Sequence, residues 1–166
     1  MVPIPDRSRF DRLIAPLIEP AYRLAFAMLR QREAAEDTVQ EATLKAWRRI
    51  GQFRDERGGI RAWYFTIVAN ECRSLRRARW WSVLRFGELR PSRRGEDAAL
   101  SAAELRQSML RLPESDRMLL YLFYWLDLPL EEVAAVARIS TAAARSRLYR
   151  AVGRLRLQLD PNEEKI

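Results

Sequence analysis

Apolar residues recur at three- and four-residue steps through most of the chain, and this spacing predicts helices. The first predicted helix covers residues 10–32, where Leu17 and Leu24 belong to an apolar stripe. Pro16 and Pro20 each remove a backbone donor, so we expect this helix to begin with a bend or as two short pieces.

Two further helices are predicted before the middle of the chain. One covers residues 33–50 and stops at Gly51, a residue typical of helix ends. The other is long, covers residues 60–81, and turns Trp63 and Val68 inward. We expect these helices and the first one to share a single core.

The helical pattern stops over residues 82–99, where Gly87 and Pro91 are among several residues typical of loops. A second helical group follows, with predicted helices over 100–112 and 114–126. No stretch alternates as a strand does. The sequence therefore predicts an all-α fold with two small helical domains joined by a flexible linker.

The predicted boundaries are 1–81 for the N-terminal domain, 82–99 for the linker and 100–160 for the C-terminal domain. The second domain is predicted to end in a helix-turn-helix. Its first helix starts after Pro129, and Ser140 or Thr141 is suited to cap its second helix.

The second helix of this predicted motif has two unlike faces. Ala144, Leu148 and Val152 recur on one side and face inward, while six arginines and no acid lie between Val133 and Leu159. An apolar seam behind a basic, hydroxyl-bearing face suits a helix that lies in a DNA major groove. A basic helical hairpin with a solvated arginine face is the plainer alternative.

The charge balance indicates a polyanionic partner. The chain has 166 residues, with 30 basic against 22 acidic side chains and no histidine. Residues 1–80 hold most of the basic excess, so DNA contact is not expected only at the helix-turn-helix. Without histidine, a glycine-rich phosphate loop or a nucleophile–base pair, we expect no enzyme, cofactor or metal site.

Other classes of protein are also disfavoured. One cysteine, Cys72, permits no intrachain disulfide and no cysteine-based zinc site. The first ten residues lack the apolar core of a signal peptide, and no run is long enough to span a membrane. We expect a cytoplasmic protein.

Two stretches outside the helix-turn-helix carry candidate chemistry. Asp37, Gln40 and Glu41 fall at helical steps on one exposed face, which suits docking of a basic partner helix or is an ordinary solvated face. Farther on, aromatic residues over 63–65 and arginines over 73–79 suit unstacked bases and phosphates. The aromatic residues otherwise belong to the core, which is what we expect of Trp63.

Three motifs in this order resemble the extracytoplasmic-function (group IV) sigma factor family. They are AEDTVQEATLKAW, RAWYFTIVANECRSLRR and LPESDRMLLYLFYWLDLPLEEVAAVARISTAAARSRLYRA. The resemblance implies a specificity subunit of bacterial RNA polymerase. Its first domain would grip the clamp helices of the β′ subunit and open the minus-ten element. Its second would bind the β flap and read the minus-thirty-five element, and an anti-sigma factor is an implied partner.

The resemblance also implies site residues. The residues matching the polymerase-docking motif are Asp37, Gln40 and Glu41. Those matching the minus-ten surface, including a base-capturing loop over 53–59, are Phe53, Arg57, Arg61, Tyr64, Asn70, Arg73, Arg76 and Arg77. Those on the minus-thirty-five reading helix are Thr141, Arg145, Ser146, Arg147, Tyr149 and Arg150.

The chain departs from the family pattern at three places. Arg138 stands where the turn usually has glycine, alanines fill positions 142–144, and Thr38 replaces a larger aliphatic residue. Two rival interpretations stay open at this point. One is a helix-turn-helix transcriptional regulator that works without polymerase, and the other is a helical adaptor that binds RNA or membrane phosphates.

Overall fold

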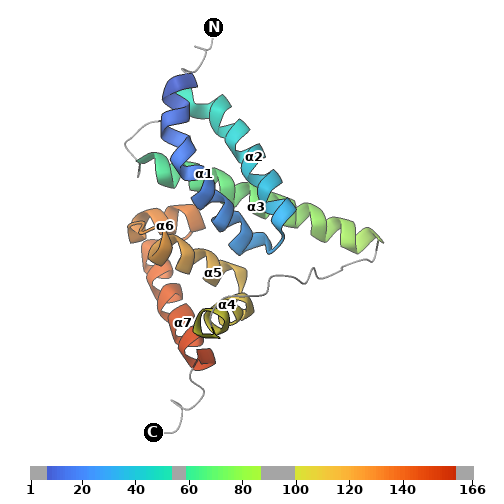
Figure 1. Ribbon diagram of the computed structural model, residues 1–166, viewed down its shortest axis with the longest axis vertical. Helices are drawn as coiled ribbons and strands as arrows, with labels where there is room; N and C mark the ends of the chain where they lie inside the picture. Colours follow the sequence, from blue (N-terminus) through green and yellow to red (C-terminus); the bar gives the residue numbers. More distant parts are fainter. Residues whose placement is uncertain (1–6, 54–58, 87–99, 160–166) are drawn as a thin grey trace.

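The computed structural model describes residues 7–53, 59–86 and 100–159, with side chains described for 7–53, 59–78 and 105–159. The chain order of its elements is α1 (Arg7–Leu29), α2 (Arg32–Arg49), η1 (Ile50–Gln52), α3 (Gly59–Phe86), α4 (Leu100–Arg111), α5 (Glu114–Leu120), η3 (Tyr121–Trp125), α6 (Leu130–Ala137) and α7 (Thr141–Leu159). Every regular element in these ranges is helical, which confirms the predicted all-α class. Figure 1 shows two helical groups, α1–α3 and α4–α7.

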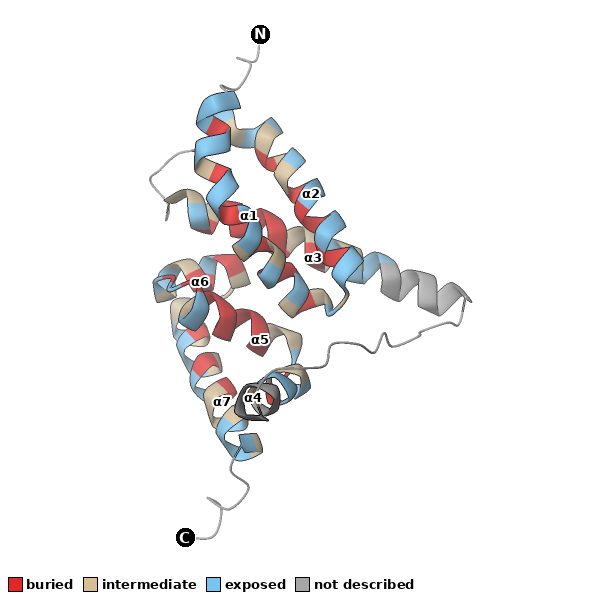
Figure 2. Ribbon diagram, in the orientation of Figure 1, coloured by how far each residue is buried: buried red, intermediate tan, exposed pale blue. Residues whose placement is uncertain are grey.

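The N-terminal group is held together by large side chains of α1 and α3 set against small ones of α2. Leu24 and Phe65 are fully buried, and α2 supplies Ala35, Ala42 and Ala46, all without exposed surface. Alanines let the α2 backbone lie close to its neighbours, so the larger side chains fill the remaining space at interior density. Figure 2 shows these buried stripes facing one another and the outer faces exposed.

Two predictions about the long helices need correction. Pro16 and Pro20 lie inside one continuous α1 instead of dividing it. The apolar stripe through Ile14, Leu17 and Ala21 holds this segment against the core, and that burial outweighs the missing proline donors. In addition, α3 continues to Phe86, so residues 82–86 are helical although the sequence assigned them to the linker. The rest of the predicted linker lies outside the described residues.

The helix following Pro113 changes its winding before it ends. The predicted single helix over 114–126 is an α-helix to Leu120 and then a π-helical turn, η3. Within that turn the Leu126 amide donates to the Tyr121 carbonyl, five residues back, at 3.0 Å. A π turn accommodates one residue more than an α turn, and such turns are rare and often lie at functional sites.

The helix-turn-helix is confirmed, and its turn has a defined geometry. Arg138 takes the left-handed conformation, with φ of 59° and ψ of 42°. The amides of Arg138 and Ile139 donate to Ala135 and Ala134 at 3.2 and 3.0 Å, which is the Schellman way of ending a helix. This left-handed conformation is less favourable for residues other than glycine by about 1–2 kcal/mol. That cost explains why glycine is usual at this position in the family.

The second helix of the motif begins as the sequence predicts. The Ser140 hydroxyl oxygen accepts from the Ala143 amide at 3.2 Å, so Ser140 is the capping residue. Ala144 and Leu148 are buried against Val133 and Val136 of α6. The inward stripe of α7 is therefore confirmed, and its opposite face is left to solvent.

The two helical groups are in contact with each other. α3 lies against α6, and α1 lies against α5 and η3. The buried apolar residues of both groups join in one continuous cluster. The predicted pair of helical groups is thus present, and α3 of the first group meets α6 of the second at the boundary between them.

Candidate nucleic-acid interface

The acidic face predicted on α2 is exposed. Asp37, Gln40 and Glu41 lie on the solvent side of the helix, whereas Thr38 and Val39 are buried. Thr38 therefore occupies a core position, where its small side chain suits the close approach of α2. The structure brings the three predicted docking residues onto one surface.

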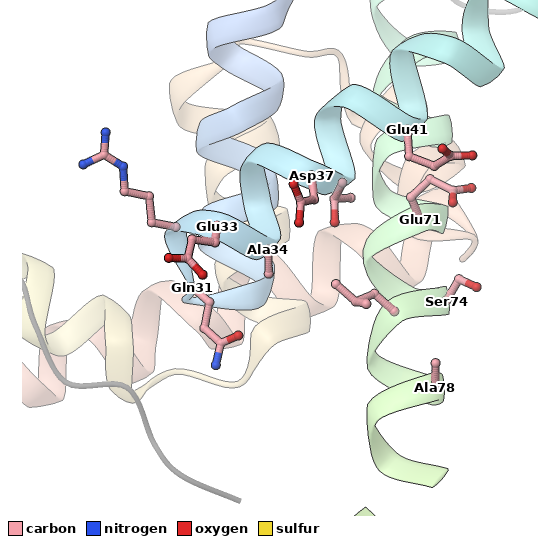
Figure 3. A pocket seen from close by; sticks show the side chains of 11 residues that line it. Gln31, Glu33, Ala34, Asp37, Glu41, Glu71, Ser74 and Ala78 are labelled. Atoms are coloured by element: carbon pink, nitrogen blue, oxygen red, sulfur yellow. The ribbon is translucent and has the colours of Figure 1, made fainter. Parts of the chain in front are cut away.

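This acidic face borders a groove between α2 and α3, shown in Figure 3. Asp37 and Glu41 line it from α2, and Glu71 and Ser74 line it from α3. Lys45 lies between α2 and α3, 2.6 Å from a Glu71 carboxylate oxygen and 3.4 Å from one of Glu41. The hydrogen bond to Glu71 raises the pKa of Lys45, so this amine is charged at neutral pH. The groove keeps a net negative charge beside a basic helix.

Arg73 and its neighbours form the centre of the predicted minus-ten surface. Arg73 is half-buried and donates to the Asn70 side-chain oxygen at 3.0 Å and to the Val136 carbonyl at 3.0 Å. Burial lowers the pKa of Arg73, and the nearby charges of Arg138 and Arg77 lower it further. This guanidinium is thus held beside other cations, and its oxygen partners are a side-chain amide and a backbone carbonyl.

The other arginines of this surface differ in their surroundings. Arg76 forms an ion pair with Glu114 at the start of α5, and Arg61 donates to the Leu126 carbonyl. Arg77 is exposed. The structure thus brings the predicted arginines to one side of α3, and that side faces the C-terminal domain.

Tyr64 is a correction to the predicted site. Its ring has no exposed surface, and its hydroxyl lies 2.7 Å from the Thr43 hydroxyl of α2. Burial raises the pKa of Tyr64, although the Thr43 contact partly opposes this. The Tyr64 side chain is a core residue with a satisfied polar end, and it does not reach the DNA-facing surface.

The predicted base-capturing loop is described only at its edges. Phe53 is half-buried, with its ring centroid 5.3 Å from that of Trp63. Trp63 is partly buried against the core, in line with the expectation that it is a packing residue. Arg57 and the remaining loop residues over 54–58 lie outside the described part of the chain.

The reading face of α7 is open to solvent. Tyr149 is 83% exposed, and Arg145, Ser146 and Arg150 are exposed beside it. Arg150 donates to the Ser146 carbonyl of its own helix at 3.4 Å. Thr141 and Arg147 are half-buried at the edges of this face.

Arg154, one turn beyond the reading face, has a different partner. Its guanidinium forms an ion pair with Asp116 of α5, and the Asp116 carboxylate is almost fully buried. This pair ties the end of α7 to the domain core and leaves the middle of the helix as the accessible part.

An exposed aromatic surface beside η3 is absent from the sequence-predicted sites. Tyr124 and Trp125 are 61% and 64% exposed. Tyr124 borders a groove to which Leu130 and Val152 also contribute. The signal in the sequence was the uninterrupted apolar run over 118–126, because a helix that is apolar on every side leaves some of those residues in water unless it is fully enclosed.

Other kinds of site find no support in the part of the chain that the structure describes. Those residues contain no group of three or more potential metal ligands, and none of their helices is long and apolar enough to cross a membrane. Cys72 is buried, and burial raises the pKa of its thiol to about 12. The thiol is therefore protonated at neutral pH and unreactive.

Comparison with known proteins relates both domains to transcription factors of one kind. Residues 13–82 match the family Sigma-70 region 2, and residues 102–155 match the family Sigma-70, region 4. The ECF RNA polymerase sigma factor EcfG of Rhodopseudomonas palustris is 30% identical over 93% of this chain and 86% of its own length. The RNA polymerase sigma factor SigV of Bacillus subtilis is 28% identical over 83% of each chain.

A solved structure shows the same fold. The sigma factor RpoE of Bartonella quintana, crystallised with the anti-sigma factor NepR, matches with a TM-score of 0.81. The match covers 94% of this chain and 99% of that one at 24% identity. CnrH, in complex with the cytosolic domain of CnrY, matches with a TM-score of 0.67.

Proposed function

Because the chain belongs to the ECF RNA polymerase sigma factors, we propose that its two helical domains divide the work of promoter recognition. A sigma factor directs core RNA polymerase to promoters and initiates transcription. The N-terminal domain, 1–81, docks on polymerase and opens the minus-ten element. The C-terminal domain, 100–160, reads the minus-thirty-five element, and the residues between them span the distance.

The acidic face of α2 is the proposed polymerase-docking surface. Asp37, Gln40 and Glu41 offer two carboxylates and an amide on a rigid helix. Charge complementarity to a basic partner raises the rate of association and fixes register. We assign the β′ clamp helices as this partner.

The arginine side of α3 is the proposed minus-ten surface. Asn70, Arg73, Arg76 and Arg77 hold backbone phosphates, and the loop that begins at Phe53 takes up an unstacked base. Extruding a base from the stack requires a few kcal/mol, so this surface works on DNA whose strands are being separated. Arg61 and Arg57 extend the same basic surface.

The exposed face of α7 is the proposed minus-thirty-five surface. Arg145 and Arg150 are placed to make paired hydrogen bonds to guanine in the major groove, and Ser146 and Tyr149 add neutral donors. Ala142 and Ala143 carry no polar group, so we expect the middle of the helix to carry the specificity. Thr141 and Arg147 supply phosphate contacts at its edges.

The aromatic surface of Tyr124 and Trp125 is the proposed contact with the β flap. Exposed aromatic residues on a rigid turn are typical anchors of protein interfaces. An anti-sigma factor is a further proposed partner, since sigma factors of this fold occur in complexes with them. We place the chain in the cytoplasm, where polymerase and promoters are, and assign it no enzymatic activity and no cofactor.

One observation carries this proposal: an exposed acidic face and an exposed basic reading face lie on different domains of one otherwise basic chain. A regulator that works without polymerase requires only the second of these. The deciding experiment is a core-polymerase binding titration, followed by run-off transcription from a promoter library.

The variant for this experiment is Asp37→Arg with Glu41→Arg, which places like charges across the docking contact. We expect binding to core to be lost, because such juxtaposition disfavours association by several kcal/mol. The matched control is Asp11→Arg with Glu19→Arg, whose side chains are 61% and 69% exposed on α1. Unchanged core affinity of the first variant, with a normal circular dichroism spectrum, would refute the docking assignment.

A further inference from the structure

One side chain joins the proposed docking face of α2 to the neighbouring helix α3. Lys45 of α2 donates to a Glu71 carboxylate oxygen of α3 at 2.6 Å. The same amine lies 3.4 Å from a carboxylate oxygen of Glu41, one turn earlier on α2. Figure 3 shows Glu41 and Glu71 meeting at the groove between the two helices. The amine of Lys45 therefore bridges two acids that belong to different helices.

The two carboxylates differ in how exposed they are. The Glu71 side chain is 19% exposed, whereas that of Glu41 is 50% exposed. An ion pair is stronger where water is partly excluded, so Glu71 is the main anchor of the amine, in line with its shorter distance. The hydrogen bond to Glu71 also raises the pKa of Lys45, and the amine keeps its charge. Glu41 stays accessible to a partner.

The pair of Glu19 and Arg23 on α1 is a useful comparison for the pair of Glu41 and Lys45. It has the same four-residue spacing, and both of its side chains are more than half exposed. An exposed pair of this kind contributes little and leaves both side chains mobile. Lys45 differs because a second helix fixes its amine before the amine reaches Glu41. A fixed cation beside Glu41 restricts the positions that this carboxylate takes.

Restricting Glu41 in advance favours docking. A long acidic side chain that becomes ordered only on binding lowers the affinity by about two- to tenfold. The charge of Lys45 would by itself repel a basic partner, but the opposite charge of Glu71 compensates it. Lys45 and Glu71 together can therefore order Glu41 while the docking face keeps its net negative charge.

We propose that Lys45, anchored by Glu71, is a positioning residue of the docking face and holds the Glu41 carboxylate where a cation of the polymerase meets it. This inference rests on the proposed docking function of α2 and adds two residues to it. Glu71 acts through Lys45, and Lys45 acts through Glu41. The docking face therefore depends on two helices, although Asp37, Gln40 and Glu41 all lie on one.

The test removes the anchored pair without changing the net charge. The full-length chain carries Lys45→Met with Glu71→Gln, two changes that nearly keep side-chain size, and biolayer interferometry measures its rates with core RNA polymerase. We expect dissociation to become about two- to tenfold faster, because Glu41 is no longer held. Association should stay within about twofold, because long-range attraction depends on net charge. Ala42 and Ala46 remain buried in the core, so circular dichroism should show an intact fold.

The single variants separate the charges of the pair from its hold on Glu41. Glu71→Gln leaves the Lys45 amine uncompensated beside the docking face, so association should slow, most strongly at low salt. Lys45→Met removes a cation from this face, so association should quicken at low salt while dissociation is still faster. Lys45→Arg keeps a cation within reach of both carboxylates and should retain the rates of the unchanged chain. A pair that merely fastens α2 to α3 predicts no opposite signs in the association rates.

The matched control is Glu19→Gln with Arg23→Met on α1. It also deletes an ion pair at four-residue spacing without changing the net charge, and it lies outside the docking face. We expect its rates with core polymerase to equal those of the unchanged chain. If the variant at Lys45 and Glu71 dissociates no faster than this control, the inference is overturned.

A Glu41→Gln background tests whether Lys45 acts through Glu41. Removing the pair there should not speed dissociation further, and a loss that persists in this background overturns the inference. The charge-reversed variant at Asp37 and Glu41 separates the inference from the proposed function. If that variant loses core binding while removal of the pair has no effect, the positioning role is wrong and the docking assignment stands. If the charge-reversed variant binds core normally, the docking assignment fails and the positioning role fails with it.

Discussion

The two proposed DNA-binding surfaces of this sigma factor differ in how exposed their arginines are. On α7, Tyr149 is 83% exposed, and Arg150 donates to a carbonyl of its own helix. On α3, Arg73 is half-buried and reaches across to α6. One surface is ready to meet duplex DNA, and the other is engaged within the protein.

This difference matches what each surface has to read. Bases in a major groove are accessible in closed duplex, so an exposed recognition face can read them before the strands separate. An unstacked base exists only after strands separate, and a free basic surface would bind single strands and phosphates without selection until then. The comparison suggests that order of action is built into the contacts of the two surfaces.

The largest effect is expected from removing the two arginines on the exposed face of α7. Arg145→Ala with Arg150→Ala deletes two proposed paired contacts to bases, each worth roughly 1–3 kcal/mol of discrimination. We expect binding of holoenzyme to its upstream element to fall by about a hundredfold or more and sequence preference there to relax. Competition between matched and scrambled upstream elements measures both.

This first prediction carries its own control. Ser146→Ala removes a smaller polar group from the same face and should weaken binding less. If holoenzyme with both arginines replaced still distinguishes the two elements, α7 is not the reading helix.

A smaller effect, confined to the opening of the DNA strands, is expected from a change at Phe53. Phe53→Ala removes an aromatic ring at the start of the proposed base-capturing loop, and stacking of a base on such a ring is worth about 1–3 kcal/mol. Open complexes, counted by permanganate reactivity of thymines, should fall about tenfold or more, with closed-complex binding unchanged. Equal loss at both steps would mean that the two surfaces do not act separately.

The salt dependence of DNA affinity should reveal whether the exposed Arg77 of α3 contacts a phosphate. Arg77→Ala should lower oligothymidylate affinity uniformly across sequences and reduce the slope of affinity against salt by about 1. The measurement is anisotropy at several salt concentrations. Because Arg77 is exposed, this change should appear in the otherwise unchanged chain.

The smallest effect is expected from a change at Arg138, in the turn between α6 and α7. Arg138 is left-handed, and glycine adopts that conformation without steric penalty. Arg138→Gly relieves roughly 1–2 kcal/mol of strain but makes the unfolded chain more flexible. We expect a net gain of at most about 1 kcal/mol in the free energy of unfolding, measured by denaturant titration, with upstream reading retained.

Local patterns predicted the parts of this fold that depend on local forces. Apolar spacing placed the three N-terminal helices and both helices of the helix-turn-helix, and residue type gave Ser140 or Thr141 as the cap, of which the structure shows Ser140. The exposed acidic face of α2 followed from Asp37 and Glu41 at helical spacing. These features are set within one or two helical turns, which is the range that a sequence pattern covers.

The features that the sequence did not reveal depend on distant partners. Tyr64 was assigned to DNA because aromatic residues near arginines fit both interpretations, and only Thr43 of another helix shows that its hydroxyl is satisfied in the core. The contact of Arg73 with Val136 joins residues 63 positions apart. The continuity of α1 through its prolines likewise reflects burial that helix propensity does not include.

The π turn at η3 has a consequence for comparing this chain with its relatives. An extra residue in a helix turns everything after it by about 100°, the angle of one helical step. Tyr124 and Trp125 lie within this turn, so they point in directions that differ from those of a continued α-helix. In a relative that is one residue shorter here, the same residue types would face another side of the helix. An alignment without a gap at this turn would therefore pair residues that point in different directions.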